Sequence, residues 1–213
     1  MGRITARRPV VRVRRGAAPD PRADTLAVEE PLELRVAGAA LTVTMRTPGH
    51  DVELALGYLV AEGVITAADD VQTARYCAGA VAAGPDGLTA NTYNVLDVAL
   101  AGHVRPPTAD LVRRTTTSSA CGVCGATSLD AVAQAARFGT VDDPLTVDLD
   151  LLLSLPDRLR AEQAVFDKTG GLHAAALFDG ATGELLVVRE DVGRHNAVDK
   201  VVGWALQAGR LPL

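Results

Sequence analysis

Apolar and polar residues alternate with the two-residue period of β-strands in the first half of the chain. The alternation runs through residues 32–36, pauses at a turn around Gly38, and resumes through residues 41–45. This pattern predicts a β-hairpin. Two further strands are predicted over residues 71–82 and 91–100, separated by a turn that contains glycine and proline.

Apolar residues spaced three and four apart indicate amphipathic helices elsewhere in the chain. The predicted helices cover residues 51–64, about 129–137, 156–167 and 196–207. A second hairpin is expected in the later half, from strands over residues 172–178 and 184–189 around a glycine-containing turn.

Capping residues refine the expected ends of two helices. Thr47 or Asp51 is expected to cap the first helix, and Gly63 to end it. Ser154 is placed to cap the helix that follows it, with Pro156 in its first turn.

The order of the elements predicts the fold class and a division of the chain. The later half alternates helix and strand, which favours an α/β or α+β arrangement. A boundary is expected near Pro106-Pro107. The predicted parts are a basic, flexible arm over residues 1–28, a smaller β-rich α+β subdomain over 29–107, and a main α/β domain over 108–213.

Charge is distributed unevenly along the 213 residues. The first fifteen residues hold six arginines and no acidic residue, while the rest of the chain is strongly acidic, which argues against nucleic acid as a partner. No apolar stretch is long enough for a membrane helix, and no apolar segment of a secretion signal follows the arginines. We therefore expect a cytoplasmic protein of ordinary globular composition.

Two of the three cysteines form a C-x-x-C pair, Cys121 and Cys124. Glycines follow each of them at Gly122 and Gly125, and a helix is predicted after the pair. A helix N-terminus stabilises an anion, so the pKa of a thiol there falls and more of it is the nucleophilic thiolate. This context favours reactive sulfur.

A zinc site is the main alternative for the cysteine pair. Structural zinc takes four ligands, and a C-x-x-C supplies two. Neither Cys77 nor any of the four histidines forms a second closely spaced pair, so the other ligands would have to come from distant positions. No permanently bound metal is expected.

Two other segments carry candidate binding residues. Gly170 and Gly171 precede a predicted strand and indicate a tight turn or a close backbone approach, and His173 could be an acid or base, a ligand, or a core histidine. The polar run at 189–196 leads into the last helix, where Arg194 and the helix N-terminus could bind an anionic cofactor. The candidate residues in this second segment are Arg194, His195, Asn196 and Lys200.

Four sequence motifs resemble the formate dehydrogenase accessory sulfurtransferase family (FdhD/NarQ). They are M-R-T-P-G at 45–49, S-A-C-G-V-C-G at 119–125, T-G-G-L-H-A-A at 169–175 and E-D-V-G-R-H-N-A-V-D-K at 190–200. Their order and spacing match over nearly the whole chain after the arm.

The resemblance implies a sulfur carrier with a persulfide intermediate on Cys121, the first cysteine of the pair. Such a protein takes sulfur from a cysteine desulfurase and passes it to the molybdenum cofactor in its bis-guanine-dinucleotide form, which activates formate dehydrogenase. The candidate residues of the two segments named above would bind that cofactor: Gly170, Gly171, His173, Arg194, His195, Asn196 and Lys200. The resemblance leaves open whether the protein forms a homodimer.

The resemblance also implies a main domain similar to cytidine deaminases. The catalytic glutamate of a deaminase is replaced by Ala175 in the run after His173, so deaminase activity is not expected. Family members usually continue beyond the helix at Gly203 into an arginine-rich loop that helps bind the guanine dinucleotide. Either this sequence is a truncated form of a longer chain, or the protein lacks part of the cofactor site. The alternative function is a zinc-binding or chaperone module for the apo-enzyme without sulfur transfer.

Overall fold

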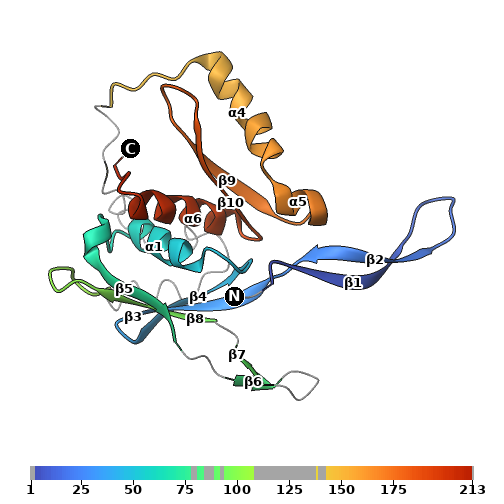
Figure 1. Ribbon diagram of the computed structural model, residues 1–213, viewed down its shortest axis with the longest axis horizontal. Helices are drawn as coiled ribbons and strands as arrows, with labels where there is room; N and C mark the ends of the chain where they lie inside the picture. Colours follow the sequence, from blue (N-terminus) through green and yellow to red (C-terminus); the bar gives the residue numbers. More distant parts are fainter. Residues whose placement is uncertain are drawn as a thin grey trace, which may run out of the picture.

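The protein is a mixed α/β structure with several sheets (Figure 1). The computed structural model describes residues 3–77, 94–107, 138 and 143–212, together with the backbone of 81–83 and 89–91. The predicted helix over 129–137 lies outside these residues. The likeness to cytidine deaminases and the division into subdomains stay predictions.

A four-stranded sheet forms one layer of the molecule, in the order β4-β3-β8-β5. The predicted first hairpin is confirmed as β3 (Glu30–Val36) paired with β4 (Ala39–Arg46). The strand β8 (Val95–Leu100) runs parallel to β3, and β5 (Val71–Tyr76) runs antiparallel to β8. These two strands are shorter than predicted.

The residues between β5 and β8 contain a separate short pair of strands. They are β6 (Val81–Ala83) and β7 (Thr89–Asn91), which form a two-stranded antiparallel sheet. The predicted strand over residues 71–82 spans β5 and most of β6, and the predicted strand over residues 91–100 begins at the last residue of β7 and includes β8.

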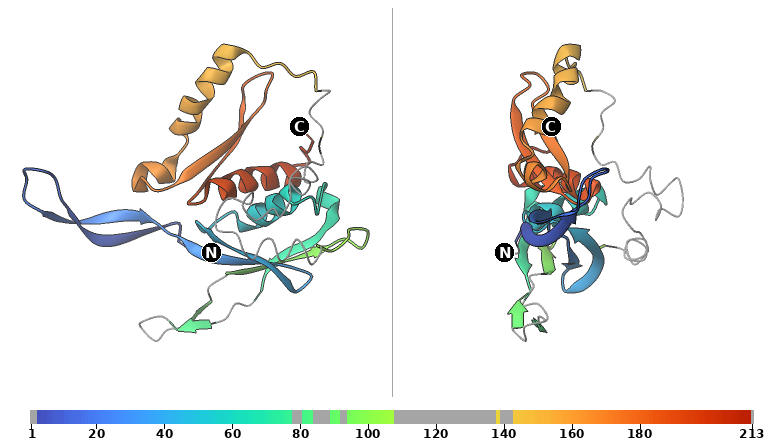
Figure 2. Two further views of the ribbon diagram at one scale, coloured as in Figure 1. Left: turned by 180° about the vertical axis from the view of Figure 1, so that it is seen from behind. Right: turned by 90° about the vertical axis from the view of Figure 1, so that its right-hand side faces the viewer.

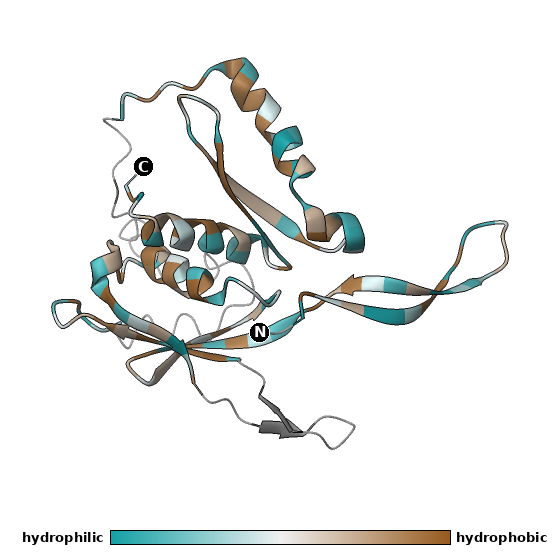
Figure 3. Ribbon diagram, in the orientation of Figure 1, coloured by the Kyte–Doolittle hydropathy of each residue, from teal (hydrophilic) through white to brown (hydrophobic). Residues whose placement is uncertain are grey.

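One face of the four-stranded sheet is covered by α1 (Asp51–Ala61), and α6 (Arg194–Gln207) lies against α1 on the side away from the sheet (Figures 1 and 2). Apolar side chains of β3, β8 and α1 form the core. The hydropathy colouring marks apolar residues along these elements (Figure 3). The largest buried apolar members are Leu32, Leu54, Leu59, Ile65, Leu96 and Leu206. Leu206 comes from beyond the predicted boundary near residue 107, so both parts of the chain share this core.

The helices α1 and α6 cross at two glycines. A Cβ atom at Gly57 would collide with the backbone carbonyl of Asp199, and a Cβ atom at Gly203 would collide with that of Glu53. Each helix therefore places its glycine against the backbone of the other. In both helices the glycine lies four residues after the residue that the partner's glycine contacts. The absence of both side chains sets how closely the helices approach.

A second hairpin packs on the other side of α6. It consists of β9 (His173–Phe178) and β10 (Leu185–Asp191), as predicted, with a register shift between Leu185 and Val187. The helices α4 (Leu149–Ala161) and α5 (Ala164–Thr169) accompany this hairpin (Figure 1).

The predicted helix over 156–167 is wrong in its bounds. The backbone instead forms α4 and α5, and Pro156 lies inside α4. Asp148 caps α4 by accepting a hydrogen bond from the amide of Leu151 at 3.0 Å. The prediction failed because proline was taken as the start of the helix, whereas an aspartate eight residues earlier supplies the cap.

The capping predictions for α1 differ from the structure as well. His50 occupies the N-cap in a left-handed conformation, with φ of 57° and no side-chain cap, and Asp51 is the first helical residue. Gly63 has a φ of 68° just after the helix, which agrees with its predicted role at the helix end.

No strand is predicted from the sequence in the basic arm over residues 1–28, but the structure has two there. Residues Thr5–Arg12 (β1) and Asp20–Ala27 (β2) pair in register as an antiparallel ribbon that projects from the body (Figures 1 and 2). The arginine-rich composition had concealed the strands. Among the described residues, no helix has the length and apolar character that crossing a membrane requires.

The crossing of α1 and α6 generates a stability prediction. Gly57→Ala should lower the free energy of unfolding by about 3 kcal/mol, because the new methyl group must push two packed helices apart. Urea denaturation followed by circular dichroism measures this change.

Gly102→Ala is the matched control for this experiment. A Cβ atom at Gly102 would meet nothing within 4 Å, so its stability should stay close to wild type. Equal stability of the two variants would contradict the close helix crossing.

Candidate functional site

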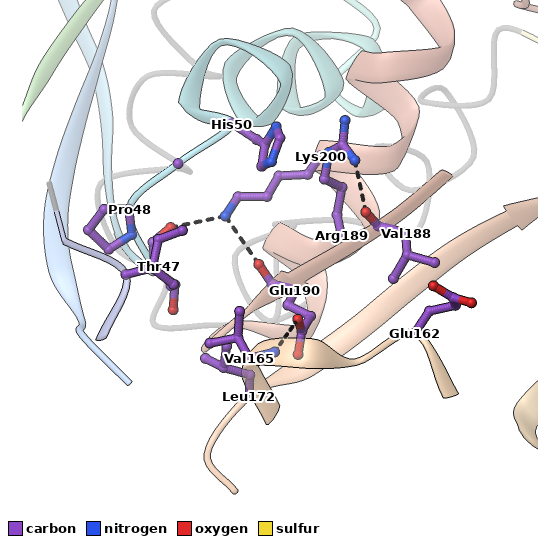
Figure 4. A pocket seen from close by; sticks show the side chains of 12 residues that line it. Thr47, Pro48, His50, Glu162, Val165, Leu172, Val188, Arg189, Glu190 and Lys200 are labelled. Atoms are coloured by element: carbon purple, nitrogen blue, oxygen red, sulfur yellow. Dashed lines mark hydrogen bonds between the residues drawn. The ribbon is translucent and has the colours of Figure 1, made fainter. Parts of the chain in front are cut away.

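A buried ion pair organises the start of α6. The Lys200 amine lies 2.6 Å from a carboxylate oxygen of Asp191, and the two side chains are 1% and 0% exposed. Lys200 also donates to the carbonyl oxygens of Thr47, at 3.0 Å, and Glu190, at 3.4 Å (Figure 4). A buried charge needs such compensation, so this lysine is fully engaged within the protein.

The same aspartate also ties the backbone of two distant turns together. Asp191 accepts hydrogen bonds from the amides of Thr47, at 3.1 Å, and Gly193, at 2.8 Å. The Thr47 hydroxyl in turn accepts from the amide of Val192 at 3.1 Å. The first motif of the chain is thereby joined to the last one.

Asn196 continues this network into the four-stranded sheet. Its amide nitrogen donates to the Met45 carbonyl at 2.8 Å and to Asp191 at 3.1 Å, and its oxygen accepts from the Thr44 hydroxyl at 3.2 Å. Asn196 and Lys200 thus hold α6 in place. A direct contact of either residue with a cofactor stays a prediction.

Arg194 and His195 are the outward-facing members of the same motif. Both side chains are exposed in the first turn of α6, whose N-cap Gly193 provides no side-chain hydrogen bond. The positive end of the helix dipole lies in this turn. The arginine adds a full charge, so the arrangement favours phosphate or another anion.

His173 lies beside this helix start. It is the cross-strand partner of Asp191, two residues before Gly193, and its side chain is exposed. The interpretation of His173 as a core histidine is therefore wrong. Arg194, His195 and His173 are all exposed, and these three residues are here called the α6 rim.

The two predicted glycines lie on the approach to His173. Gly170 ends α5 with a φ of 67°, and its amide donates to the Phe166 carbonyl at 2.6 Å. Gly171 lies against the side chain of Ala27 at the base of β2. The positive φ of Gly170 confirms the tight turn, whereas a Cβ atom at Gly171 would meet Ala27 only at 3.9 Å, so no close backbone approach is required there.

A pocket of about 140 Å³ lies behind the Thr47–Lys200 contact (Figure 4). The turn that precedes α1 forms one wall, and β10 with the start of α5 forms the other. Its charged lining residues are His50, Glu162, Arg189, Glu190 and Lys200. Most of these charges are paired within the protein, which leaves the pocket without an excess of positive charge for a phosphate.

The pairs around the pocket are close and partly buried. Arg189 forms two hydrogen bonds with Glu53, one of them at 2.8 Å, and His50 lies 3.4 Å from the same carboxylate. Burial opposes ionisation of Glu53, but Arg189 and His50 outweigh it and lower its pKa to about 2. Both Glu190 oxygens accept amides of α5, from Val165 and Phe166.

Two acidic residues, Asp51 and Asp199, were not among the predicted site residues. Asp51 is buried and pairs with Arg46 at 3.0 Å, while Tyr76 donates to it at 2.8 Å. Asp199 lies in the last motif, and burial, with the nearby charges of Glu62 and Asp191, raises its pKa to about 7. The place of Asp199 in the motif at 190–200 could have indicated it, whereas Asp51 lies outside the four motifs.

The cysteine pair Cys121 and Cys124 lies outside the described residues, so its distance from the α6 rim stays open. Cys77 is described, and it is a half-buried free cysteine. Within the described part of the chain, no three histidine, cysteine or acidic side chains gather in a way that could hold a metal ion.

The structure is a mixed α/β fold with an exposed arginine and two exposed histidines near the N-terminus of its last helix. The chain belongs to the FdhD/NarQ family, whose model matches residues 27–212.

Relatives of this chain are similar over almost its whole length. A protein of Mycolicibacterium paratuberculosis is 58% identical over 210 residues, which cover 99% of this chain and 75% of the relative. A protein of Mycobacterium tuberculosis is 56% identical over 215 residues, which cover 100% of this chain and 76% of the relative. Both are named sulfur carrier protein FdhD.

A solved structure has the same fold. It is a putative formate dehydrogenase accessory protein from Desulfotalea psychrophila, with a TM-score of 0.62 and 20% sequence identity. The similarity covers 97% of this chain and 70% of the other.

The network at α6 predicts that neighbouring basic residues behave differently on mutation. Lys200→Met should lower the free energy of unfolding by about 3–5 kcal/mol, because it leaves the Asp191 carboxylate buried without its countercharge. Arg194→Ala, on the exposed side of the same helix, should change it by less than about 0.5 kcal/mol.

Chemical denaturation at neutral pH measures both variants. A Lys200→Met protein as stable as Arg194→Ala would show that the buried pair does not hold α6 in place.

Proposed function

We propose that this chain is a sulfur carrier that serves the maturation of a formate dehydrogenase. The observation that carries the proposal is the near full-length similarity, at 56–58% identity, to proteins named sulfur carriers. Membership of the FdhD/NarQ family supports the same role.

Cys121 is the proposed carrier, and Cys124 is the second thiol of its site. The Cys121 thiolate attacks the terminal sulfur of a persulfide on a cysteine desulfurase. The sulfur–sulfur bond of the donor breaks, a new one forms on Cys121, and the desulfurase cysteine leaves as a thiolate. Electrons balance in this exchange without an added oxidant or reductant.

The proposed recipient of the sulfur is a molybdenum cofactor in its bis-guanine-dinucleotide form, which is cargo for this protein. The α6 rim supports this assignment because it offers an exposed guanidinium and an open helix N-terminus to the phosphates of a dinucleotide. Gly170 and Gly171 leave the approach to His173 free of side chains. Asn196 and Lys200 position the rim through their buried contacts.

The proposed partners are a cysteine desulfurase and the apo-form of formate dehydrogenase. Both would be met in the cytoplasm, where we place the protein. The alternative, a zinc-binding or chaperone module without sulfur transfer, gives the opposite outcome in the following experiment.

Incubation with a cysteine desulfurase and cysteine should add the mass of one sulfur atom to the peptide that contains Cys121. Cys121→Ala should abolish this gain, because the thiolate that accepts the sulfur is removed. Mass spectrometry of the digested protein without reducing agent measures the modification.

Cys77→Ala is the control and should load like wild type. Equal loss in both variants, or stoichiometric zinc that disappears with Cys121, would contradict sulfur transfer and favour the zinc module.

Guanosine diphosphate should bind to the α6 rim with an affinity that falls as salt rises. Arg194→Ala should weaken this binding by about 1.5–3 kcal/mol, the scale of a hydrogen bond to a charged group. Isothermal titration calorimetry measures the affinity, and persulfide loading on Cys121 should survive the same change.

Arg105→Ala removes another exposed arginine and serves as the matched control. Unchanged nucleotide affinity in Arg194→Ala would place the phosphate contacts outside the α6 rim.

A further inference from the structure

The pocket of about 140 Å³ between the turn before α1 and the strand β10 is large enough for a small organic molecule. An apolar cavity of similar volume holds a benzene ring, so this pocket can take roughly six non-hydrogen atoms. No step of the proposed sulfur transfer uses it. Its apolar lining residues are Ile4, Pro48, Val165, Leu172 and Val188.

The basic side chains of the pocket are neutralised by acids behind its walls. The Lys200 amine lies 2.6 Å from Asp191 and donates to two backbone carbonyls, so its three protons are all engaged. Arg189 is paired with Glu53, and His50 lies 3.4 Å from the same carboxylate. These side chains therefore add no uncompensated positive charge to the pocket.

The two acidic side chains of the pocket keep their negative charge. Within the described part of the chain, no cationic side chain pairs with Glu162 or Glu190. Glu190 accepts the amide of Val165 at 2.9 Å on one oxygen and that of Phe166 at 2.7 Å on the other. Each of these oxygens has a second lone pair for a ligand. Glu162 is exposed and lines the same pocket, so a ligand can reach it as well.

We propose that this pocket binds a primary alkylammonium group. Such a group supplies a positive charge and three donors to Glu162 and Glu190, while its alkyl stem packs against the apolar lining. Both acids lie on the wall formed by β10 and the residues before α5, across from His50 (Figure 4). A phosphate or carboxylate in the same place would be repelled by them.

The ammonium group can belong to a free amine or to the end of a lysine side chain of a bound protein, because both present the same chemistry. In either case the occupant touches the turn that contains Thr47 and the strand β10 at once. The buried Lys200 contact joins the same two segments. The occupant therefore adds a second connection between them.

Titration of the intact chain with butylammonium chloride tests the proposal. The amides of Val165 and Phe166 donate to Glu190, so their NMR signals should shift with a dissociation constant on the order of millimolar. The affinity should fall as salt rises. Butanol has a similar shape without the charge and should bind roughly tenfold more weakly.

Removal of each carboxylate charge measures its share of the binding. Glu162→Gln should weaken butylammonium binding roughly two- to fivefold, the scale of an exposed ion pair. Glu190→Gln should weaken it on the order of tenfold, because this carboxylate is half-buried. Glu184→Gln changes an exposed glutamate outside the pocket and should bind like wild type. Circular dichroism and urea denaturation establish that each variant is folded.

A second ligand distinguishes the two sources of the ammonium group. Shifts of the same two amides with Nα-acetyl-lysine amide would assign the pocket to a lysine side chain, and shifts with butylammonium alone would assign it to free amines. The proposal is overturned by the absence of binding, by butanol that binds as tightly as butylammonium, or by glutamate variants that bind like wild type. The test involves neither Cys121 nor a nucleotide, so its failure leaves the proposed sulfur transfer untouched.

Discussion

The buried ion pair between Lys200 and Asp191 holds together segments that are more than 140 residues apart in the chain. Lys200 reaches the carbonyl of Thr47, and Asp191 accepts the amide of the same residue. The turn before α1 and the turn before α6 are thereby locked to each other. An ion pair in a low-dielectric interior tolerates little displacement, since each charge depends on the other. The position of the helix start therefore depends on this contact.

One sequence motif consequently has two tasks, separated by the helix geometry. Asp191, Asn196 and Lys200 face inward and satisfy one another and the sheet. Arg194 and His195 face outward from the same turn. The buried contacts of the inward-facing residues fix the first turn of α6, and this turn determines where the outward-facing side chains lie. Supporting contacts of this kind give binding residues a defined geometry.

Sequence patterns predicted the elements with strong periodicity and failed where another signal was stronger. The hairpin of β3 and β4, the core of α1 and most of α6 followed from apolar spacing. The ribbon was missed because its paired strands bury little, so arginine and proline obscured the alternation. The dense charge cluster at residues 189–196 was recognised as unusual, but whether Lys200 points inward or outward depends on a turn far away in the sequence. Tertiary contacts of that kind leave no local pattern.

The glycine crossing of α1 and α6 also determines how the molecule opens. With both helix backbones in contact, the amides of α1 and α6 can exchange with solvent only when the two helices separate, which also exposes Leu54 and Leu206 of the core. Ribbon amides beyond the base need no such separation. The backbone amides of α1 and α6 should therefore exchange slowly, and those of the outer ribbon should exchange fast. The two turns joined by Thr47 should be protected together with the two helices.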